Sequence, residues 1–423
     1  MKKHVVIVGG GFGGLKAAKV LSQYPELVDV TLIDKRNYHL FQPLLYQVAT
    51  AGLSPADIAM PIRNVLSDAK NVTVYLDEVK AVHPENNSLE VTSVAAKYDY
   101  LILACGASHS YFGKDHWEEF APGLKTLEMA TEIRRRILMA FESAEKVADM
   151  NIQKEWLTFV IVGAGPTGVE MAGAISEIAK QTMEADFRNI STAHTRVILI
   201  EAGKKVLGSF NETLSSNALI DLKKLGVEVM LDTRVTDINS SGVTFSGPDG
   251  REEVILSRTV VWAAGVKPSS INSTLNVPLD RAGRIIVSKK LSLEKFPNLF
   301  IIGDQSHFEE DGGNVLPGLA PVAIQMGTHA AKNIIRLIKN EAALDFKYTD
   351  KGQMATIGRK LAVMEFKGIK ARGMFAWLAW LLVHIYYLIG FKNRLFVLMQ
   401  WTWSYLTFSR GARLITKRDW KDT

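Results

Sequence analysis

The sequence predicts an α/β fold with two parallel sheets, and the main reason is a glycine pattern that occurs twice. Each copy has the spacing G-x-G-x-x-G, follows an apolar β-branched run and opens a helix-like stretch. The two sets are Gly9, Gly11 and Gly14 in VVIVGGGFGGLKAA, and Gly163, Gly165 and Gly168 in FVIVGAGPTGVEMA. This strand–turn–helix context is typical of Rossmann-like dinucleotide-binding domains. Two such domains on one chain are what electron transfer from one dinucleotide to another requires.

Each glycine has a physical reason. The first allows a tight turn, the second lets the backbone approach a pyrophosphate, and the third lets the helix pack closely on the strand. The helix N-terminus then offers free N–H groups and a positive dipole end to the phosphates.

An acid at the end of the next strand should bind a ribose hydroxyl. Asp34 ends DVTLID 20 residues after Gly14, and Glu201 ends RVILIE 33 residues after Gly168. The longer second gap predicts a longer helix over 170–187. The alternative for either motif is a glycine turn followed by a solvated acid.

The elements of the first half follow in order. Residues 1–105 predict a strand, the glycine loop, a helix to about Ser22, a strand to Asp34, a strand in VTVYLDEV and a strand in YDYLILACGA. The apolar spacing in 111–155 is helical, and its arginines at 134–136 are expected on a solvated face.

Residues 156–266 repeat the strand–helix–strand order and end in TVVWAAGV. Gly106 in ACGA and Gly265 in AAGV therefore occupy corresponding places, and both are expected to contact a cofactor. The turn SGPDG at 246–250 joins two hairpin strands. A buried strand at 297–304 ends in Asp304, and a helix starts at Ala320.

The second dinucleotide domain is thus predicted to be inserted in the first. The expected boundaries are 1–115 and 275–345 for the first domain, 116–274 for the second, and 346–423 for a C-terminal region.

Composition narrows the function. The chain has 423 residues, a net charge of +6 and one cysteine, Cys105, which excludes an intramolecular disulfide and a Cys-x-x-Cys redox pair. No histidine cluster has metal-ligand spacing, and no nucleic-acid motif is visible, so neither a metal nor a nucleic acid is expected. Lys2 and Lys3 are followed at once by the first strand and glycine loop, so a fold start is expected rather than a signal peptide.

The motifs together resemble the two-dinucleotide-binding flavoprotein oxidoreductases. NYHLFQPLLYQVATAGLSP at 37–55, GPTGVE and the apolar C-terminus look like those of type II NADH:quinone oxidoreductases, which are single-subunit respiratory enzymes that do not pump protons. The resemblance implies non-covalent FAD at the first fingerprint and NADH at the second. It also implies hydride transfer from NADH to FAD and electron delivery to a membrane quinone.

The resemblance also assigns roles to particular residues. Asp304 should contact the FAD ribityl chain, and the helix that starts at Ala320 should point its N-terminus at the flavin. The run APVAIQ at 320–325 is similar to the family's A-Q-x-A-x-Q quinone pattern but has Pro321 in place of the first glutamine. Gln325 should then hydrogen-bond a quinone carbonyl or the flavin, unless it is only a polar residue of a packed helix.

Glu170 follows the second fingerprint and is expected near the nicotinamide and flavin, where it holds NADH or relays a proton to quinone. The alternative is an acid in the first helical turn, stabilised by the helix dipole. Gln47 in FQPLLYQVA is a weaker flavin-proximal candidate. Glu201 should favour NADH, because a carboxylate repels the 2′-phosphate of NADPH. The alternative is that Lys204 and Lys205, which follow closely, rescue NADPH binding.

Two apolar segments, 375–391 and 395–408, end the chain with a basic tail and are separated by residues 392–394. They are short for a span, which needs about 20 residues. Their tryptophans and tyrosines and the basic residues favour helices that lie in one leaflet, on the cytoplasmic face of the inner membrane. The alternatives are a core helix pair, a homodimer interface or a spanning helix.

Other functions stay open. An NAD(P)H oxidase or soluble-acceptor flavin reductase would use the same two domains. A flavin-bearing scaffold or signalling protein would bind both dinucleotides without turnover.

Overall fold

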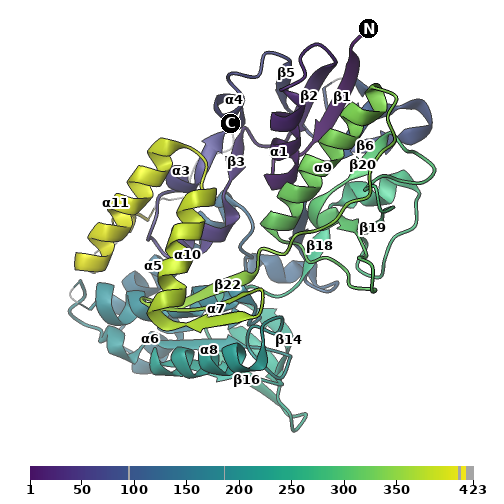
Figure 1. Cartoon of the computed structure of the whole chain (residues 1–423). Coiled ribbons are helices and arrows are strands. Elements are labelled where there is room, and N and C mark those ends of the chain that lie inside the picture. The colour runs from purple at the N-terminus through teal and green to yellow at the C-terminus, as the bar shows by residue number, and fades with distance from the viewer. Residues whose placement is uncertain (94–95, 185, 408–410, 416–423) are drawn as a thin grey trace. The chain divides into compact units, whose positions relative to one another are not determined.

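The computed structural model describes residues 1–93, 96–184, 186–407 and 411–415 (Figure 1). The chain divides into two compact units. The first comprises Met1–Leu40, Ala59–Ser108 and Val266–Thr349, and the second comprises Phe41–Ile58, His109–Gly265 and Asp350–Thr423. Both units are therefore discontinuous, and each is built from three segments of the chain. The predicted domain boundaries at 115, 274 and 345 stay predictions.

A five-stranded parallel sheet forms the centre of the first unit, in the order β20-β9-β1-β2-β5. Its strands are β1 (Lys3–Val8), β2 (Val28–Asp34), β5 (Val72–Leu76), β9 (Tyr100–Leu103) and β20 (Leu299–Ile301). Strands β1 and β9 are almost wholly buried, as their continuous apolar runs predict for a sheet covered on both faces. The strand, helix and strand order predicted for 1–105 is confirmed.

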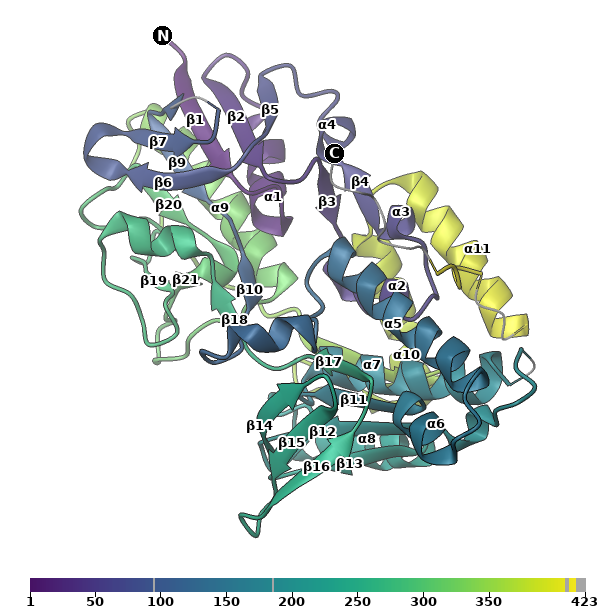
Figure 2. The ribbon, with the colours of Figure 1, turned by 180° about the vertical axis from the view of Figure 1, so that it is seen from behind.

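Two helices of this unit, α1 (Phe12–Leu21) and α9 (Ala320–Ile338), lie side by side (Figures 1 and 2). They approach closely because glycines meet where they pack. A Cβ on Gly327 would lie 2.2 Å from the Gly13 carbonyl oxygen, so no larger residue fits without moving a helix.

Smaller strands complete the first unit. An antiparallel sheet contains β6 (Val79–His83), β7 (Ser88–Val91) and β8 (Ala96–Lys97). Two-stranded pairs join β3 (Tyr38–Leu40) to β4 (Ala59–Pro61) and β19 (Ile285–Ile286) to β21 (Ser306–His307).

The second unit repeats the parallel arrangement with four strands in the order β13-β12-β11-β17. These are β11 (Thr158–Val162), β12 (Arg196–Ile200), β13 (Val227–Met230) and β17 (Thr259–Trp262), and α5 (Leu127–Glu145), α6 (Met150–Trp156), α7 (Pro166–Glu177) and α8 (Glu212–Lys224) belong to the same unit. Figure 2 shows the antiparallel sheet of β14 (Arg234–Asn239), β15 (Gly242–Ser246) and β16 (Glu252–Leu256). The predicted turn at 246–250 joins β15 to β16.

Two helix predictions in this unit are wrong in part. The helix expected over 170–187 is α only to Glu177 and continues as a π-helical turn, Ile178–Thr182, in which Met183 N–H donates to the Ile178 carbonyl. The arginines of α5 do not form a solvated face. Arg134 is 8% exposed, and Arg136 is bonded to Glu132, because a long aliphatic stem lets arginine pack where its pattern looks polar.

The C-terminal part of the second unit has a three-stranded antiparallel sheet and two helices. They are β22 (Gln353–Gly358), β23 (Leu361–Phe366), β24 (Ile369–Arg372), α10 (Gly373–Tyr387) and α11 (Phe391–Thr407). The break between the helices precedes the expected position: Gly390 has φ +88°, and residues 392–394 form the first turn of α11. Within 1–93, 96–184, 186–407 and 411–415, no helix is long and apolar enough to cross a membrane. Most of the predicted basic tail, including Arg410, Lys417, Arg418 and Lys421, lies outside the described residues.

Candidate functional site

Both fingerprint loops have the same geometry. Gly9 has φ +102° and Gly163 has φ +100°, a left-handed conformation that glycine adopts without strain. A Cβ on Gly14 would lie 1.9 Å from the Gly9 carbonyl oxygen, and a Cβ on Gly168 would lie 1.8 Å from that of Gly163. The first and third glycines therefore build the turn and the close helix–strand contact in each unit.

The second glycines face open space. A Cβ at Gly11 or at Gly165 would meet no heavy atom within 4 Å. Each of these glycines is also the N-cap of its helix, α1 or α7, so the free N–H groups of the first turn are next to the gap. The residues present therefore fit a dinucleotide pyrophosphate in both units.

The acids at the strand ends bond to the loops in the same way. Asp34 Oδ2 accepts the Gly10 N–H at 2.5 Å, and Glu201 Oε2 accepts the Ala164 N–H at 2.6 Å. Gly10 and Ala164 each follow the first glycine of a fingerprint. A second backbone bond at 2.7 Å, from Arg36 N–H or Gly203 N–H, fixes each carboxylate. Both acids are held at the edge of a predicted dinucleotide site with further lone pairs for ribose hydroxyls.

The predicted correspondence of ACGA and AAGV is also present. Ala104 N–H donates to Val8 at 2.8 Å, and Ala263 N–H donates to Val162 at 2.7 Å, so each segment continues beside its first strand. Gly106 and Gly265 follow with φ +69° and +73°.

In the first unit, Asp304 lies in the turn after β20, close to the start of α9. A Cβ on Gly318, two residues before Ala320, would lie 3.1 Å from Asp304 Oδ1. Pro321 occupies the first turn of α9, where a missing N–H costs no helical hydrogen bond. The geometry therefore suits the roles proposed for Asp304 and Ala320.

Gln325 is more constrained than its motif suggests. Its Nε2 donates to the Thr349 carbonyl at 3.0 Å, and its Oε1 accepts the Thr349 N–H at 3.0 Å. Both ends of the carboxamide are thus paired with one backbone residue. Any contact between Gln325 and a quinone has to use its remaining hydrogen or lone pair, so its quinone role stays a prediction.

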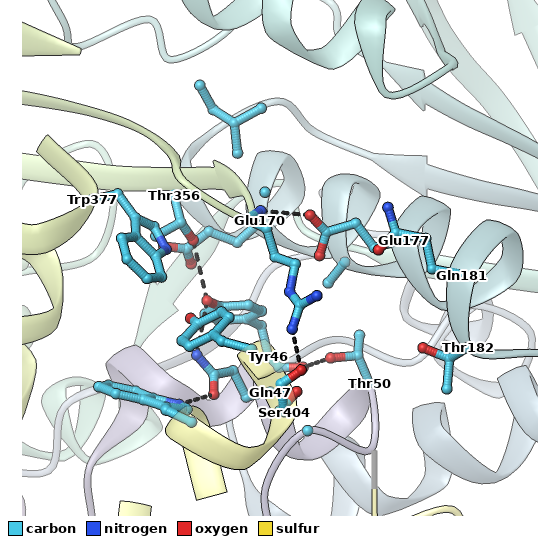
Figure 3. A pocket seen from close by; sticks show the side chains of 17 residues that line it. Tyr46, Gln47, Thr50, Glu170, Glu177, Gln181, Thr182, Thr356, Trp377 and Ser404 are labelled. Atoms are coloured by element: carbon cyan, nitrogen blue, oxygen red, sulfur yellow. Dashed lines mark hydrogen bonds between the residues drawn. The ribbon is translucent and has the colours of Figure 1, made fainter. Parts of the chain in front are cut away.

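A pocket lies wholly within the second unit, with about 710 Å³ of empty space that includes open solvent (Figure 3). Its lining comes from segments far apart in the sequence: α2 (Leu45–Ala49), α7 with its π turn, β22, α10 and α11. Both polar and aromatic groups line it. The polar set includes Gln47, Glu170, Thr356 and Arg359, and the aromatic set is Tyr46, Trp377, Trp401 and Tyr405.

Glu170 carries a perturbed carboxyl in this pocket. It follows the first turn of α7, so the helix-dipole alternative has no support. Its side chain faces the cavity beside Thr356 (Figure 3), and the surrounding protein removes most of its water. Burial raises the pKa of Glu170 from 4.5 to about 8, although a hydrogen bond from the Thr356 backbone opposes the shift. The carboxyl is therefore largely protonated at neutral pH.

Arg359 closes the outer part of the pocket. Its backbone N–H donates to Glu177 of α7, and its guanidinium donates to the Ser404 carbonyl in the last turn of α11. The guanidinium also lies 5.1 Å from the centre of the Tyr405 ring. A cation at a helix C-terminus is favourable, so Arg359 attaches α11 to β22 and α7.

Comparisons with known proteins agree with this architecture. A family profile described as pyridine nucleotide-disulphide oxidoreductase matches residues 3–327, and one described as NDH2 C-terminal domain matches residues 351–410. The type II NADH:quinone oxidoreductase Ndh of Mycobacterium tuberculosis is 44% identical over 430 residues, which cover 98% of this chain and 90% of that protein. The chain belongs to the type II NADH:quinone oxidoreductases.

Other members of the family match over a similar length. The M. tuberculosis type II NADH:quinone oxidoreductase NdhA is 43% identical over 99% of this chain and 90% of its own length. The structure of NDH2 from Plasmodium falciparum in complex with NADH covers 99% of this chain and 100% of that chain, with a TM-score of 0.89 at 20% identity. This likeness confirms the predicted fold class with its two dinucleotide-binding domains.

Sequence reasoning for this type II NADH:quinone oxidoreductase missed part of the pocket. Gln47 and Glu170 were candidates, and both line it. Tyr46, Thr356 and Trp401 were not candidates as site residues, because each stands in an apolar or β-branched run that predicts only packing. The one available signal was the neighbouring polar pair Tyr46–Gln47 within such a run.

Proposed function

We infer that this type II NADH:quinone oxidoreductase oxidises NADH and reduces a quinone, with FAD as its redox cofactor. Family membership over 98% of the chain carries this conclusion. When bound, FAD supplies the two-electron chemistry that joins the two half-reactions. The chain supplies binding: the open space at Gly11 receives the FAD pyrophosphate and that at Gly165 the NADH pyrophosphate.

We propose the pocket of the second unit as the quinone site. A quinone head group is a flat apolar ring with two carbonyl acceptors, and this pocket combines aromatic walls with hydrogen-bond donors. Trp377, Trp401 and Tyr405 provide the walls, while the protonated Glu170 provides a donor. The position of the Glu170 carboxyl next to a wall of aromatic rings is the observation that carries the proposal, and its raised pKa supports it.

Quinone reduction consumes two electrons and two protons for each quinol formed. Glu170 with a pKa of about 8 holds a proton on its carboxyl at pH 7 and gives it to a quinone oxygen as the electrons arrive. Water that reaches the open pocket supplies the second proton and then reprotonates the carboxylate.

At the second fingerprint, we propose that Glu201 sets a preference for NADH over NADPH. The carboxylate accepts a hydrogen bond from a ribose 2′-hydroxyl and repels a 2′-phosphate. Repulsion in a partly desolvated site costs on the order of 1–3 kcal/mol, or roughly 5–150-fold in affinity.

We further propose that α10 and α11 hold the protein on the cytoplasmic face of the inner membrane as a peripheral protein. Both helices carry large apolar side chains in contact with solvent, which we call the apolar face: Phe375, Leu378, Leu382, Phe391, Leu395 and Met399. Phe375 and Phe391 are each 80% exposed. Patches of this kind mark membrane or protein interfaces, and the basic residues Lys392 and Arg394 suit anionic lipid, each worth about 1 kcal/mol near the surface.

Vesicle flotation tests this assignment. The variant Phe375→Glu/Leu382→Glu should lose binding to vesicles of zwitterionic and anionic phospholipid, while the matched control Val254→Glu, on the exposed edge of β16, should float as the unsubstituted protein does. Unchanged flotation of the double variant would place the membrane contact elsewhere. If that variant instead converts a dimer to a monomer in detergent, the apolar face is a homodimer interface.

Steady-state kinetics test the function itself. Purified holoenzyme with NADH should reduce a short-chain quinone much faster than oxygen. A faster reaction with oxygen would support the oxidase alternative, and a stable reduced flavin without turnover would support the scaffold alternative.

A further inference from the structure

A chain of three hydrogen bonds links α11 to the inner end of the pocket (Figure 3). Trp401 Nε1–H donates to Gln47 Oε1 at 2.7 Å, and Gln47 Nε2–H donates to Tyr46 Oη at 3.0 Å. Tyr46 Oη and Thr356 Oγ1 lie 3.1 Å apart. None of the four side chains belongs to a residue more than 9% exposed, so little of their surface is in contact with solvent.

The Trp401 donor fixes the direction of the hydrogen bonds in this series. An indole N–H can only donate, so it holds the Gln47 carboxamide with its oxygen toward Trp401 and its NH₂ group toward Tyr46. The Tyr46 oxygen then accepts from Gln47, and its own proton is available for donation. That proton can be donated to Thr356 Oγ1, which lies within hydrogen-bond distance, or to an acceptor in the pocket when one is bound.

Without the indole N–H, the Gln47 carboxamide has no fixed orientation. Turned by 180°, it presents its oxygen to Tyr46 and takes the phenol proton for itself. The pocket then loses the Tyr46 donor, although Tyr46 itself is unchanged.

Trp401 is well placed to impose this order, because its ring is itself held in place. The ring packs on Trp380 with centroids 5.6 Å apart, and Trp380 is 1% exposed. Trp380 also contacts Tyr46, with centroids 6.4 Å apart. The same aromatic cluster therefore orients the first and third members of the chain.

The last member of the hydrogen-bond series, Thr356, contacts Glu170. Its hydroxyl lies within hydrogen-bond distance of Tyr46 Oη, and its backbone forms a hydrogen bond with the Glu170 carboxyl. Burial raises the pKa of Tyr46 well above its usual range, so the phenol keeps its proton. Two protonated donors, Tyr46 and Glu170, thus stand at the same end of the pocket.

We propose that Trp401 is a positioning residue for quinone reduction, whose indole N–H orients Gln47 so that the Tyr46 phenol proton is directed at a quinone carbonyl. This inference rests on the pocket being the quinone site. Because Trp401 belongs to α11, the position of that helix also affects the rate of quinone reduction in the pocket.

The test compares three variants of the holoenzyme in detergent with a short-chain quinone. Trp401→Phe keeps an aromatic ring on Trp380 and removes only the N–H donor. Trp403→Phe, two residues on in the same helix and 65% exposed, is the matched control. Gln47→Met removes the relay at similar side-chain length.

We expect Trp401→Phe to lower kcat for quinone by roughly fivefold to tenfold, with the quinone KM within about twofold and the rate of flavin reduction by NADH unchanged. Trp403→Phe should match the unsubstituted enzyme. The double variant Trp401→Phe/Gln47→Met should be no slower than Gln47→Met alone, because both changes act through one carboxamide. A merely structural role for Trp401 would make the two effects multiply.

The outcomes separate this inference from the function on which it rests. If the unsubstituted enzyme fails to reduce quinone, the proposed function is wrong. If it reduces quinone but Trp401→Phe behaves like Trp403→Phe, or the two effects multiply in the double variant, the function stands and the positioning role is wrong.

Discussion

Replacing Glu170 by glutamine should make the protein more stable at alkaline pH. The folded protein holds this carboxyl protonated up to a pKa of about 8, whereas the unfolded chain releases the proton near 4.5. Between these values the unfolded state binds fewer protons, so the stability that the raised pKa gives at low pH is lost as pH rises through this window. Glutamine has the shape of the protonated acid and does not titrate.

The magnitude follows from the width of the window. One pKa unit corresponds to about 1.36 kcal/mol, and the part of the window between pH 5 and pH 8 gives at most about 3.5 kcal/mol. Because the side chain faces an open pocket, solvent screens part of this free-energy difference, and we expect a change in stability of about 1–3 kcal/mol. The stability difference between Glu170→Gln and the unsubstituted protein should therefore grow by that amount from pH 5 to pH 8.

Thermal unfolding of FAD-saturated protein at pH 5, 6.5 and 8 measures the effect. The control is Glu212→Gln, since Glu212 lies on α8 with 83% of its side chain exposed. Tyr46, Glu177 and Arg359 share the pocket with Glu170 and are left unchanged in all variants. If the gap in Tm between Glu170→Gln and the unsubstituted protein is the same at all three pH values, the carboxyl is not held protonated and the reasoning fails.

The same substitution should slow quinone reduction at least about tenfold, because the amide has no acidic proton to give, while flavin reduction by NADH changes little. Loss of the NADH step alone would assign Glu170 to nicotinamide binding instead. In the unsubstituted enzyme the rate of quinone reduction should fall as pH rises through 8.

Three further predictions concern the dinucleotide sites and the cysteine. Gly165→Val should abolish NADH binding, because its side chain enters the space proposed for the pyrophosphate. It should leave FAD binding and the Tm unchanged, because that space contains no protein atom within 4 Å. Gly168→Ala should lower the Tm, because its Cβ would lie 1.8 Å from a carbonyl oxygen. Equal Tm values for these two variants would contradict the loop geometry. Glu201→Gln should narrow the ratio of kcat/KM for NADH over NADPH at least about fivefold, and an unchanged ratio would remove Glu201 from cofactor choice. Cys105 should resist alkylation at pH 8 until the protein is denatured, because burial raises the pKa of its thiol to about 12; rapid labelling of native protein would refute this.

The backbone of the fold was predictable because its signals are local. Gly9 and Gly163 adopt positive φ. A β-branched run before each glycine loop and a helix-forming stretch after it leave few alternatives to a strand followed by a helix. The pocket was not predictable in the same way. It joins α2 to β22 and α11, more than 300 residues later, and a hydrogen bond such as that from Trp401 to Gln47 depends on packing that no local pattern encodes.

Two wrong predictions come from reading polarity and periodicity along the sequence. A polarity pattern counts arginine as solvent-exposed, yet Arg134 is buried along its stem. Helical periodicity does not distinguish an α turn from the π turn at 178–182. The quinone role of Gln325 stays a prediction, and motif similarity could not show that Thr349 bonds both ends of its carboxamide.

The glycine contact between α1 and α9 has a consequence for how FAD is selected. Each helix presents its N-terminus to the proposed FAD site, α1 at the fingerprint loop and α9 at Ala320. With Gly327 seated on the Gly13 backbone, neither helix can slide along the other, so the two termini stay a fixed distance apart. The spacing of the two helix N-termini is therefore set before any ligand binds. In the proposed site, FAD would contact both termini without a rearrangement of the protein, whereas a ligand confined to one terminus would lose the stabilisation that the other provides.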